Sequence, residues 1–479
     1  MTLQQTSNFY NKNNNISQIY KIIEEKQIKQ LDFKIVNTWG SLYHMSVPIQ
    51  SISNNLLEHG LPFDGSSVSG FSDDLNLSDC RMKPDINTMF IDLFHETKTL
   101  AFLCNIVDIE NPLKYHPFCS RNIIKKTEDY LNSMFECSSL WGPELEFYLF
   151  SNVRFDLKDN GCFYIVDAKE SSWNRGIDMS PNLGITLNHQ KGYCLDKPFD
   201  QMDDIRSKIV STAIDIGINP NLHHHEVGSA GQCEISLKHN SLPNVTDEIV
   251  LLKYIIRNVA HQSGFAATFM PKPLSKENGS GLHFHQSFIK DNKPLFYDEC
   301  SKFFKLSKWA LSYIAGILYH MPALMAFTNA TTNSYKRLHP GFEAPTNRSF
   351  SLGNRTSAIR IPKYAITPES KRIECRISDA SGNIYYSMSA MQLAGIDGVK
   401  KGLDPFKLGF DAINKKPKKM LPISLMDAMD ALKKDHRFLT ETGVFSEELI
   451  EIWIEKKRRE YLELERFPHP YEFREYFGC

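Results

Sequence analysis

Apolar and polar residues alternate with two different periods along this chain, and the change falls near residues 111–120. Before it, the apolar runs are short and separated by Gly and Pro, as in FKIVNTWGSLYHMSVP and TLAFLCNIVDI, which predicts strands. After it, longer stretches carry apolar residues at helical spacing, between polar strand-like runs. The predicted helices span residues 120–134, 202–216, 247–263, 307–321 and 446–463.

This order of elements predicts an α+β fold rather than a regular βαβ array. A chain of 479 residues is also too long for one compact core. We expect a disordered arm at 1–16, a small, mostly β domain at 17–112 and a larger domain at 113–479.

Charge and composition exclude several classes of partner. The 55 Lys and Arg balance 56 Asp and Glu, so there is no bulk attraction to nucleic acid or to an anionic membrane. The most apolar stretch, residues 309–327, contains His320 and Pro322 and predicts a buried helix rather than a membrane span. The polar N-terminus lacks a secretory pattern, and ten scattered cysteines without a CxxC pair are typical of reduced thiols. We expect a cytoplasmic protein.

The run GPELEFYLF carries the sharpest local signal. Glu144 and Glu146 are two apart in a β-prone segment, so a strand would project both from one face. Two adjacent carboxylates repel each other unless a positive charge lies between them, and a hard divalent cation meets that need. A half-exposed strand with a charged outer face is the alternative.

The run HHHEVGSAGQCE places Glu226 and Glu234 on either side of a turn of small residues. The preceding histidines, 223–225, raise the possibility of zinc. Consecutive residues do not share a face of a strand, however, so at most one of the three is expected to be functional.

The run ENGSGLHFHQS combines a tight loop with a strand. Asn278 and Gly279 lie in the loop, where glycine permits close approach of the backbone. His283 and His285 then alternate with apolar residues, so that one can bind a metal and the other can face a ligand. Alone, such histidines are more often structural.

A cluster of arginines follows between residues 337 and 376. Its charged members are Arg337, Glu343, Arg355, Arg360, Arg372, Glu374 and Arg376. Clustered arginines recognise phosphate or carboxylate through forked hydrogen bonds, and a surface ion-pair network is the alternative. Four glutamates with one or two histidines suit Mg²⁺ or Mn²⁺ better than zinc. Metals and arginines together indicate phosphoryl transfer by an ATP-using enzyme, although the chain has no glycine-rich phosphate loop.

From about Leu31 to the C-terminus, the chain resembles the type I glutamine synthetase family. The motifs that carry the resemblance are FDGSSVSGF, GPELEFYLF, HHHEVGSAGQCE, FMPKPLSKENGSGLHFHQS, NATTNSYKRLHPGFEAP and NRTSAIRIP, in family order. The resemblance implies a β-grasp-like N-terminal domain, a larger catalytic domain and a dodecamer of two hexameric rings with active sites between subunits.

The resemblance also implies a role for each motif residue. One metal ion would bind Glu146, Glu226 and Glu234, and the other Glu144, His283 and Glu374. Glutamate would bind near Asn278, Gly279, Arg337 and Arg376. His285 and Ser287 would border ATP, with Arg372 in the same nucleotide region, and Arg355 and Arg360 would stabilise the transferred phosphoryl group.

The implied reaction has two steps. The side-chain carboxylate of glutamate attacks the γ-phosphate of ATP, and ammonia then attacks the resulting acyl phosphate. Glu343 would accept a proton from the ammonia adduct, and its loop would exclude water.

Asn37 is the main departure from the family pattern. Members usually carry an aspartate here, which reaches the neighbouring subunit's site and helps to bind ammonium and remove a proton. An amide is neutral and cannot act as a base. The alternatives are therefore a γ-glutamyl ligase for a larger amine, such as methylamine, ethanolamine or a polyamine, with Trp39 lining a reshaped pocket, and a catalytically silent ring homologue. An unrelated kinase is disfavoured because kinase motifs are missing.

Two further positions bear on regulation and assembly. Phe410 aligns with the tyrosine that some members modify by adenylylation, so no adenylylation is expected. The aromatic C-terminal run FPHPYEFREYFGC resembles the tail that docks into the facing ring in relatives.

Overall fold

The computed structural model describes residues 15–71, 78–178, 181–411 and 419–479. Residues 1–14 of the predicted arm lie outside this range, and Ile16, its last residue, begins helix α1 (Ile16–Lys26).

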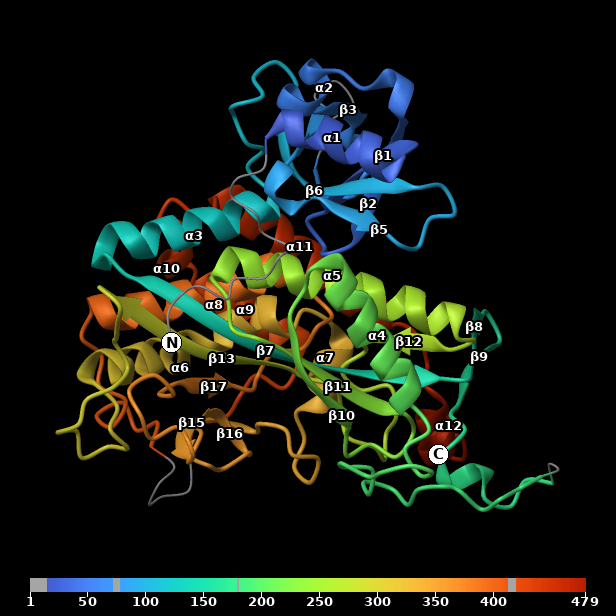
Figure 1. The fold of residues 1–479 in the computed structure, drawn as a ribbon. Coiled ribbons are helices and arrows are strands. Elements are labelled where there is room, and N and C mark those ends of the chain that lie inside the picture. Colours follow the sequence, from blue (N-terminus) through green and yellow to red (C-terminus); the bar gives the residue numbers. More distant parts are fainter. Residues whose placement is uncertain (1–14, 72–77, 179–180, 412–418) are drawn as a thin grey trace.

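A six-stranded sheet organises the N-terminal part of the described chain (Figure 1). Its strands are β1 (Gln30–Val36), β2 (Leu42–Pro48), β3 (Leu61–Asp64), β4 (Asp79–Pro84), β5 (Phe90–Asp92) and β6 (Thr99–Asp108). They follow the order β2-β1-β6-β4-β3, with β5 also paired to β6, and β1 and β6 run parallel at the centre. Helix α1 and the short helix α2 (Asn54–His59) accompany this sheet. The strand-like pattern of residues 17–112 thus predicted the type of structure correctly.

A nine-stranded sheet forms the base of the rest of the molecule. Its strands are β7 (Ser138–Phe150), β10 (Pro220–His225), β11 (Gln232–Leu237), β12 (Ala266–Thr268), β13 (Leu282–Lys290), β14 (Lys293–Pro294), β15 (Asn347–Leu352), β16 (Ser357–Ile361) and β17 (Ile373–Cys375). The main path is β10-β11-β7-β13-β17-β16-β15. A separate hairpin pairs β8 (Asn152–Lys158) with β9 (Gly161–Asp167).

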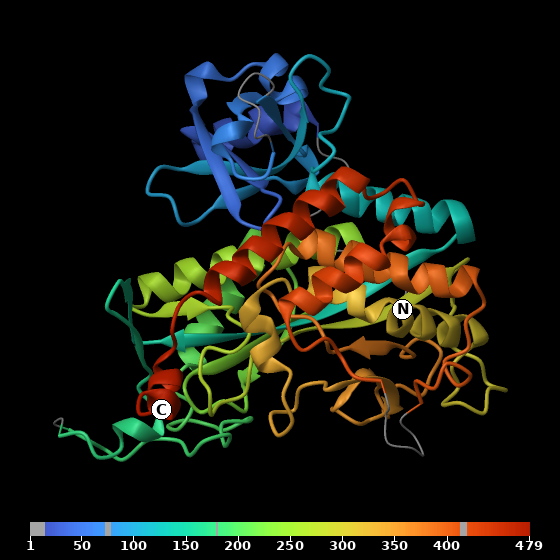
Figure 2. The ribbon, with the colours of Figure 1, turned by 180° about the vertical axis from the view of Figure 1, so that it is seen from behind.

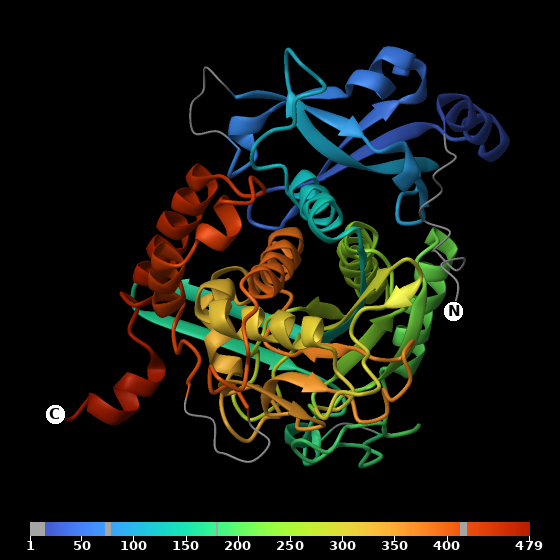
Figure 3. The ribbon, with the colours of Figure 1, turned by 90° about the vertical axis from the view of Figure 1, so that its left-hand side faces the viewer.

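Helices lie between the two sheets and cover one face of the larger one (Figures 1 and 3). The remaining helices are α3 (Ser120–Phe135), α4 (Asp203–Ile216), α5 (Leu242–Gln262), α6 (Lys308–Thr328), α7 (Thr332–Arg337), α8 (Ile384–Lys400), α9 (Leu425–Lys434), α10 (Arg437–Thr440), α11 (Glu447–Leu464) and α12 (Pro470–Tyr476).

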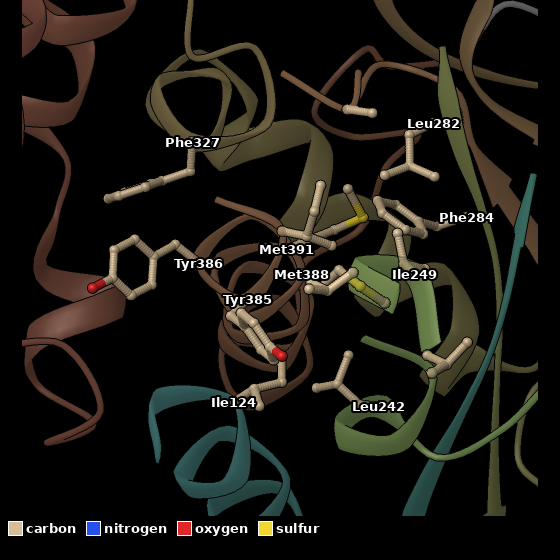
Figure 4. Close-up of a cluster of buried hydrophobic side chains, with 14 of the residues drawn as sticks. Ile124, Leu242, Ile249, Leu282, Phe284, Phe327, Tyr385, Tyr386, Met388 and Met391 are labelled. Atoms are coloured by element: carbon tan, nitrogen blue, oxygen red, sulfur yellow. The ribbon is translucent and has the colours of Figure 1, made fainter. Parts of the chain in front are cut away.

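Helix α8 is at the centre of the core. Its side chains Tyr385, Met388 and Met391 meet residues from α3, α5 and β13, such as Leu242 and Phe284 (Figure 4). Strand β13 alternates in the usual way, with Leu282 and Phe284 in this core and His283 and His285 on the other face. Because the helices cover one face, the polar side chains collect on the opposite face.

Four of the five predicted helices begin within one residue of their predicted position. The fifth, α5, starts at Leu242, five residues early, because Pro243 is tolerated in a first helical turn. Helix α6 continues to Thr328, past Pro322, because the surrounding core supports it across the proline.

Helix α6 is long and apolar enough to cross a membrane, with a mean hydropathy of 1.4, but 83% of its most apolar window is buried within the structure. It is a core helix, as its sequence predicted. Helix α11 crosses the back of the molecule, and the chain ends with α12 beside the β8–β9 hairpin (Figures 1 and 2).

Candidate functional site

Strand register brings the predicted metal ligands together on the open face of the larger sheet. Glu146 of β7 lies directly opposite Glu234 of β11, which in turn lies opposite His224 of β10. On the other edge of β7, Glu144 lies opposite His283 of β13. The motifs are far apart in the sequence but adjacent in the sheet.

The next strands extend the same row. His285 of β13 lies opposite Glu374 of β17, and Glu374 lies opposite Arg360 of β16. Glu374 accepts short hydrogen bonds from both Arg360 and Arg376. The sheet therefore runs from a carboxylate-rich end to an arginine-rich end.

Three overlapping groups of side chains could each hold a metal ion. They are Glu144 with His283 and Glu374, Glu146 with Glu234 and His283, and His224 with Glu226 and Glu234. Within each group the potential ligand atoms lie within 4.8 Å of one another. His283 joins the first two, since its Nδ1 is 3.4 Å from Glu144 and its Nε2 is 3.6 Å from Glu146.

The carboxylates are buried close enough to disturb one another's ionisation. Burial, and then the charges of Glu146 and Glu234, raise the pKa of Glu226 well above its usual range. Burial also raises the pKa of Glu234. Burial alone would raise the pKa of Glu144 too, but hydrogen bonds from His283 and His285 hold it well below its usual range. A divalent cation would relieve this repulsion, so the donor set fits an oxygen-preferring metal.

Only His224 of the three consecutive histidines faces these carboxylates. Its Nε2 lies 3.4 Å from Glu234. His225 is fully buried and its Nε2 lies 2.6 Å from Glu170, so it supports the strand from behind. His223, with a buried Nδ1 that has no hydrogen-bond partner among the described residues, is in no metal-competent group there. One of the three histidines thus faces the carboxylates, and the expectation that at most one of them is functional stays a prediction.

The loop between Glu277 and Leu282 is tightly packed against the site. A Cβ on Gly279 would lie 2.4 Å from the carbonyl oxygen of Pro271 and 2.7 Å from Arg337. The buried hydroxyl of Tyr148 donates to the carbonyl oxygen of Asn278 over 2.6 Å. Glycine is therefore required where the loop passes between the backbone and an arginine.

Two of the predicted arginines are held mainly by backbone carbonyls and acids. Arg337 is buried and donates to the carbonyls of Arg376, Ile377 and Ser378. Arg376 also donates to the carbonyl oxygen of Arg355 over 3.2 Å. These bonds fix the guanidinium planes in place before any anion binds.

Most predicted site residues line one cavity of about 300 Å³. The predicted residues among its lining are Glu144, Glu146, Glu226, Glu234, Asn278, Gly279, His283, Arg337, Glu343, Arg355, Arg360 and Arg376. Arg355 and Glu343 are exposed at its edge, and Glu343 has a left-handed backbone conformation with φ of 55°. The cavity therefore has an acidic side, a basic side and a loop at its mouth.

Five predicted residues lie outside that lining. Glu374 is fully buried behind it, bonded to the two arginines. His285 lies 2.8 Å from Glu144, and Arg372 donates to His285 over 3.3 Å. Ser287 follows on the same face of β13, two residues on. These three extend the site along the sheet.

Asn37 is the fifth, and it lies in the turn between β1 and β2. Its side-chain oxygen accepts hydrogen bonds from the backbone N–H groups of Trp39 (3.1 Å) and Ser41 (2.8 Å), and its amide nitrogen donates to the carbonyl of Ser69 (3.2 Å). The carboxamide is thus used within its own turn and is only 2% exposed. Trp39 packs on Trp453, with ring centroids 5.5 Å apart.

Sequence reasoning missed several residues of the cavity. Tyr193 reaches it from a long loop and packs edge-on against His224, and no local pattern marks it. Gln232 donates to the carbonyl oxygen of Gly279 over 3.1 Å. Tyr364 lies under the Arg372 guanidinium, 5.2 Å from it. His224 could have been singled out, because it lies near the end of β10, two residues before Glu226.

A fourth acidic group, Asp32 with Asp92 and His95, is not a comparable site. The buried ammonium of Lys34 lies 2.7 Å from Asp32 and 3.0 Å from Asp92. It already supplies the positive charge that a metal would provide.

Comparison with known proteins agrees with this geometry. The family described as the β-grasp domain of glutamine synthetase matches residues 27–109, and the glutamine synthetase catalytic domain family matches residues 117–476. Glutamine synthetases of Mycolicibacterium smegmatis and Aquifex aeolicus are each 42% identical over 96% of this chain and 98% of their own length. A glutamine synthetase from Plasmodium falciparum, solved by cryo-electron microscopy, has a TM-score of 0.88 at 30% identity, covering 97% of this chain and 99% of that one.

Sequence, fold and site therefore lead to one conclusion. The chain belongs to the glutamine synthetase family and has the activity of a glutamate–ammonia ligase, with glutamate, ammonia and ATP as substrates and a dependence on divalent metal ions.

Proposed function

We propose that this chain activates the side-chain carboxylate of glutamate as an acyl phosphate inside the 300 Å³ cavity and passes it to ammonia there. The observation that carries the proposal is the cavity's division into a carboxylate–histidine side and an arginine side. Direct amide formation would have to expel oxide from the carboxylate, and phosphorylation replaces oxide by phosphate as the leaving group.

The metal ions are proposed to be two Mg²⁺ or Mn²⁺. One would be held by Glu146, Glu226 and Glu234. The other would be held by Glu144, His283 and Glu374. When bound, such ions neutralise the phosphates and the glutamate carboxylate that would otherwise repel the acidic side of the cavity. Predominantly carboxylate ligands favour these ions over zinc.

Glutamate is proposed to bind between Asn278, Gly279, Arg337 and Arg376. The buried Arg337 and Arg376 carry fixed charges for its carboxylates, and the close approach at Gly279 leaves the loop backbone free to contact it. A rigid setting of this kind brings the attacking oxygen into line with the γ-phosphate at little entropic cost.

The phosphoryl group is proposed to transfer beside Arg355 and Arg360, with ATP running along β13 past His285, Ser287 and Arg372. Arg355 is exposed at the cavity edge and can move toward an incoming nucleotide. As charge develops on the transferred group, the guanidinium groups donate to its oxygens. ADP leaves with the bridging oxygen, and the acyl phosphate remains.

Glu343 is proposed to take the proton that ammonia loses after it attacks the acyl carbon. Its loop follows Gly341, which has φ of 93°, so the chain turns sharply over the cavity mouth. Closure of this loop would keep water from hydrolysing the acyl phosphate. Phosphate then leaves and the amide is complete.

Asn37 is proposed to act on the neighbouring subunit's amine site through the turn that it stabilises. Its neutral carboxamide is compatible with a larger amine as a further substrate beside ammonia. Phosphate release with ATP, Mg²⁺ or Mn²⁺ and glutamate, with ammonium or a panel of amines, tests this. Turnover at low millimolar ammonium is expected, additional turnover with a larger amine would establish the further substrate, and no turnover from the intact oligomer would overturn the proposed mechanism.

The assembly is proposed to be a dodecamer of two hexameric rings in the cytoplasm. Exposed apolar side chains support a contact surface at the end of the molecule where the β8–β9 hairpin and α12 lie. They include Phe155, Tyr164, Ile165, Tyr471, Phe473 and Phe477. Domains of 17–112 and 113–479 are proposed for each subunit. No adenylylation is proposed at Phe410, which is fully buried and lacks a hydroxyl.

A further inference from the structure

A second cavity lies where the N-terminal sheet meets the catalytic domain. Its volume is about 570 Å³, and it shares no lining residue with the cavity of the carboxylate clusters. Its lining includes the β1–β2 turn on one side and helix α5 on the other, and the N-terminal sheet lies above α5 in Figures 1 and 3. Ligand sites often form at such junctions between domains.

The charged groups of this cavity are all basic. Among the described residues, its lining includes Lys34, His44, Lys253 and Arg257 and contains no Asp or Glu. Lys34 is neutralised by its two buried aspartates, and His44 lies 2.7 Å from one of them, Asp32. Lys253 and Arg257 are therefore the cations whose charge the cavity wall does not balance.

Lys253 is buried at 8% exposure, and its ammonium donates to the carbonyl oxygen of Ala380 over 2.5 Å. Within the described chain, no carboxylate comes within ion-pairing distance of it. Asp379 attracts it through space, but that carboxylate is itself buried and bonded to Asn329 and Ser381. A buried ammonium without an ion pair is costly in free energy.

Arg257 follows one helical turn later and is exposed at the cavity mouth. Both cations lie over the ring of Phe269, at 5.2 Å and 5.1 Å from its centre. Burial, and then the charge of Arg257, lower the pKa of Lys253 to about 7. A bound anion would stabilise both charges at once.

The rest of the lining is suited to an organic molecule. Val36, Val250 and Ile384 are buried apolar residues, while Asn258 and Thr331 offer polar groups. The volume lies within the range of small-molecule sites and exceeds what inorganic phosphate fills. We propose that this cavity binds a small organic anion, with its carboxylate or phosphate group between Lys253 and Arg257 and its remainder against the apolar wall.

Such a ligand would join the two domains. It would contact α5 on one side and, on the other, the turn that contains Trp39 and follows Asn37. Binding should therefore stabilise the junction against opening.

Calorimetric titration of the full-length oligomer with succinate and with inorganic phosphate tests the proposal and distinguishes the two anion types. Loss of a charged hydrogen bond weakens binding by roughly 10-fold or more, which is the expected effect of Arg257→Gln. Lys253→Met should also abolish binding while leaving the melting temperature unchanged or higher, because it removes the buried charge. Lys208→Gln, at an exposed position of α4, is the matched control and should change neither anion binding nor the melting temperature.

Phosphate can also bind the catalytic cavity, whose lining includes Arg355, a residue that the lining of the junction cavity does not share. The variant Arg355→Gln therefore distinguishes phosphate binding in the catalytic cavity from binding in the junction cavity. Binding that survives in Arg355→Gln but is lost in Arg257→Gln belongs to the junction cavity. The proposal is wrong if neither anion binds saturably, or if Arg257→Gln binds both as tightly as the unmodified chain. It is equally wrong if Arg257→Gln alters only the oligomeric state, since a neighbouring subunit would then fill the cavity.

Discussion

At the scale of single residues, the carboxylates of the cavity repel one another, and Glu226 shows this most clearly. Burial, and then the charges of Glu146 and Glu234, raise its pKa, and His224, 3.8 Å away, offsets only part of that effect. A structure that keeps such a residue buried has a use for the positive charge that would bind there.

Replacing Glu226 with Gln should therefore weaken divalent metal binding. Loss of even an outer partner of a metal site costs roughly 10–100-fold in affinity, and loss of a direct ligand should cost at least that. Titration with Mn²⁺, followed by electron paramagnetic resonance, measures the change. Glu369→Gln, at an exposed position, is the control. Equal affinity in both variants would remove Glu226 from the ligand set.

The same residue predicts a pH dependence in the metal-free protein. A carboxyl whose pKa is raised on folding stabilises the fold below its unfolded pKa, roughly 4.3, and the contribution is lost as the pH rises through the raised value. With chelator present, Glu226→Gln should thus be more stable than the unmodified chain at pH 8 but not at pH 4. Excess Mg²⁺ should reverse the order at pH 8. Melting curves at the two pH values measure this, and parallel curves would contradict it.

The role of the Asn37 carboxamide in its turn can be tested by replacing its amide nitrogen with an oxygen, as in Asn37→Asp. An aspartate could still accept from Trp39 and Ser41, but its carboxylate would face the carbonyl oxygen of Ser69 instead of donating to it. Asn37→Asp should lower the stability by about 1–3 kcal/mol, the cost of an unsatisfied buried group. Asn55→Asp, at an exposed position, is the control and should not lower the stability. Denaturant unfolding measures both, and a more stable Asn37→Asp would show that the amide is not specified by its turn.

At the scale of elements, the close packing of the 277–282 loop is the feature most sensitive to a small change. Gly279→Ala would place a Cβ 2.4 Å from the backbone oxygen of Pro271, which cannot rotate away. The resulting shift should cost roughly 1–3 kcal/mol and raise the KM for glutamate by about 10-fold or more. Gly161→Ala in the β8–β9 hairpin meets nothing within 4 Å and is the matched control. Unchanged KM in both would separate this loop from glutamate binding.

Sequence alone predicted which faces of the elements carry chemistry, but not which faces meet. The spacing of Glu144 and Glu146 fixed a shared face because the side-chain period of a strand is two. Arg372, Glu374 and Arg376 have the same spacing, yet the strand there spans only Ile373–Cys375, and the flanking arginines leave it in different directions to bond different partners.

Local sequence patterns could not predict the register between strands or the contacts between residues far apart in the sequence. Nothing near Glu234 indicates that it lies opposite Glu146, because that pairing depends on the whole nine-stranded sheet. Tyr193 reaches the cavity from a long loop for the same reason. The metal-ligand assignments came from the resemblance to a family, because matching its motifs implies that the strands pair as they do in that family.

At the scale of the whole molecule, the end that carries α12 is unusually apolar for a surface. No residue of α12 is buried. Its aromatic residues Tyr471 and Phe473 are 54% and 57% exposed, and Phe477, directly after it, is 83% exposed. An exposed aromatic patch of this kind marks a protein contact.

Removing residues 468–479 should therefore separate the proposed dodecamer into hexameric rings without unfolding the subunit, because no residue of α12 is buried. Sedimentation velocity measures the halved mass, and circular dichroism checks the fold. Phe473→Ser and Phe477→Ser together should act in the same direction, whereas Arg474→Ser, on the same helix, should leave the rings paired. If the truncated protein sediments as the full-length one does, the contact between the rings does not depend on the tail.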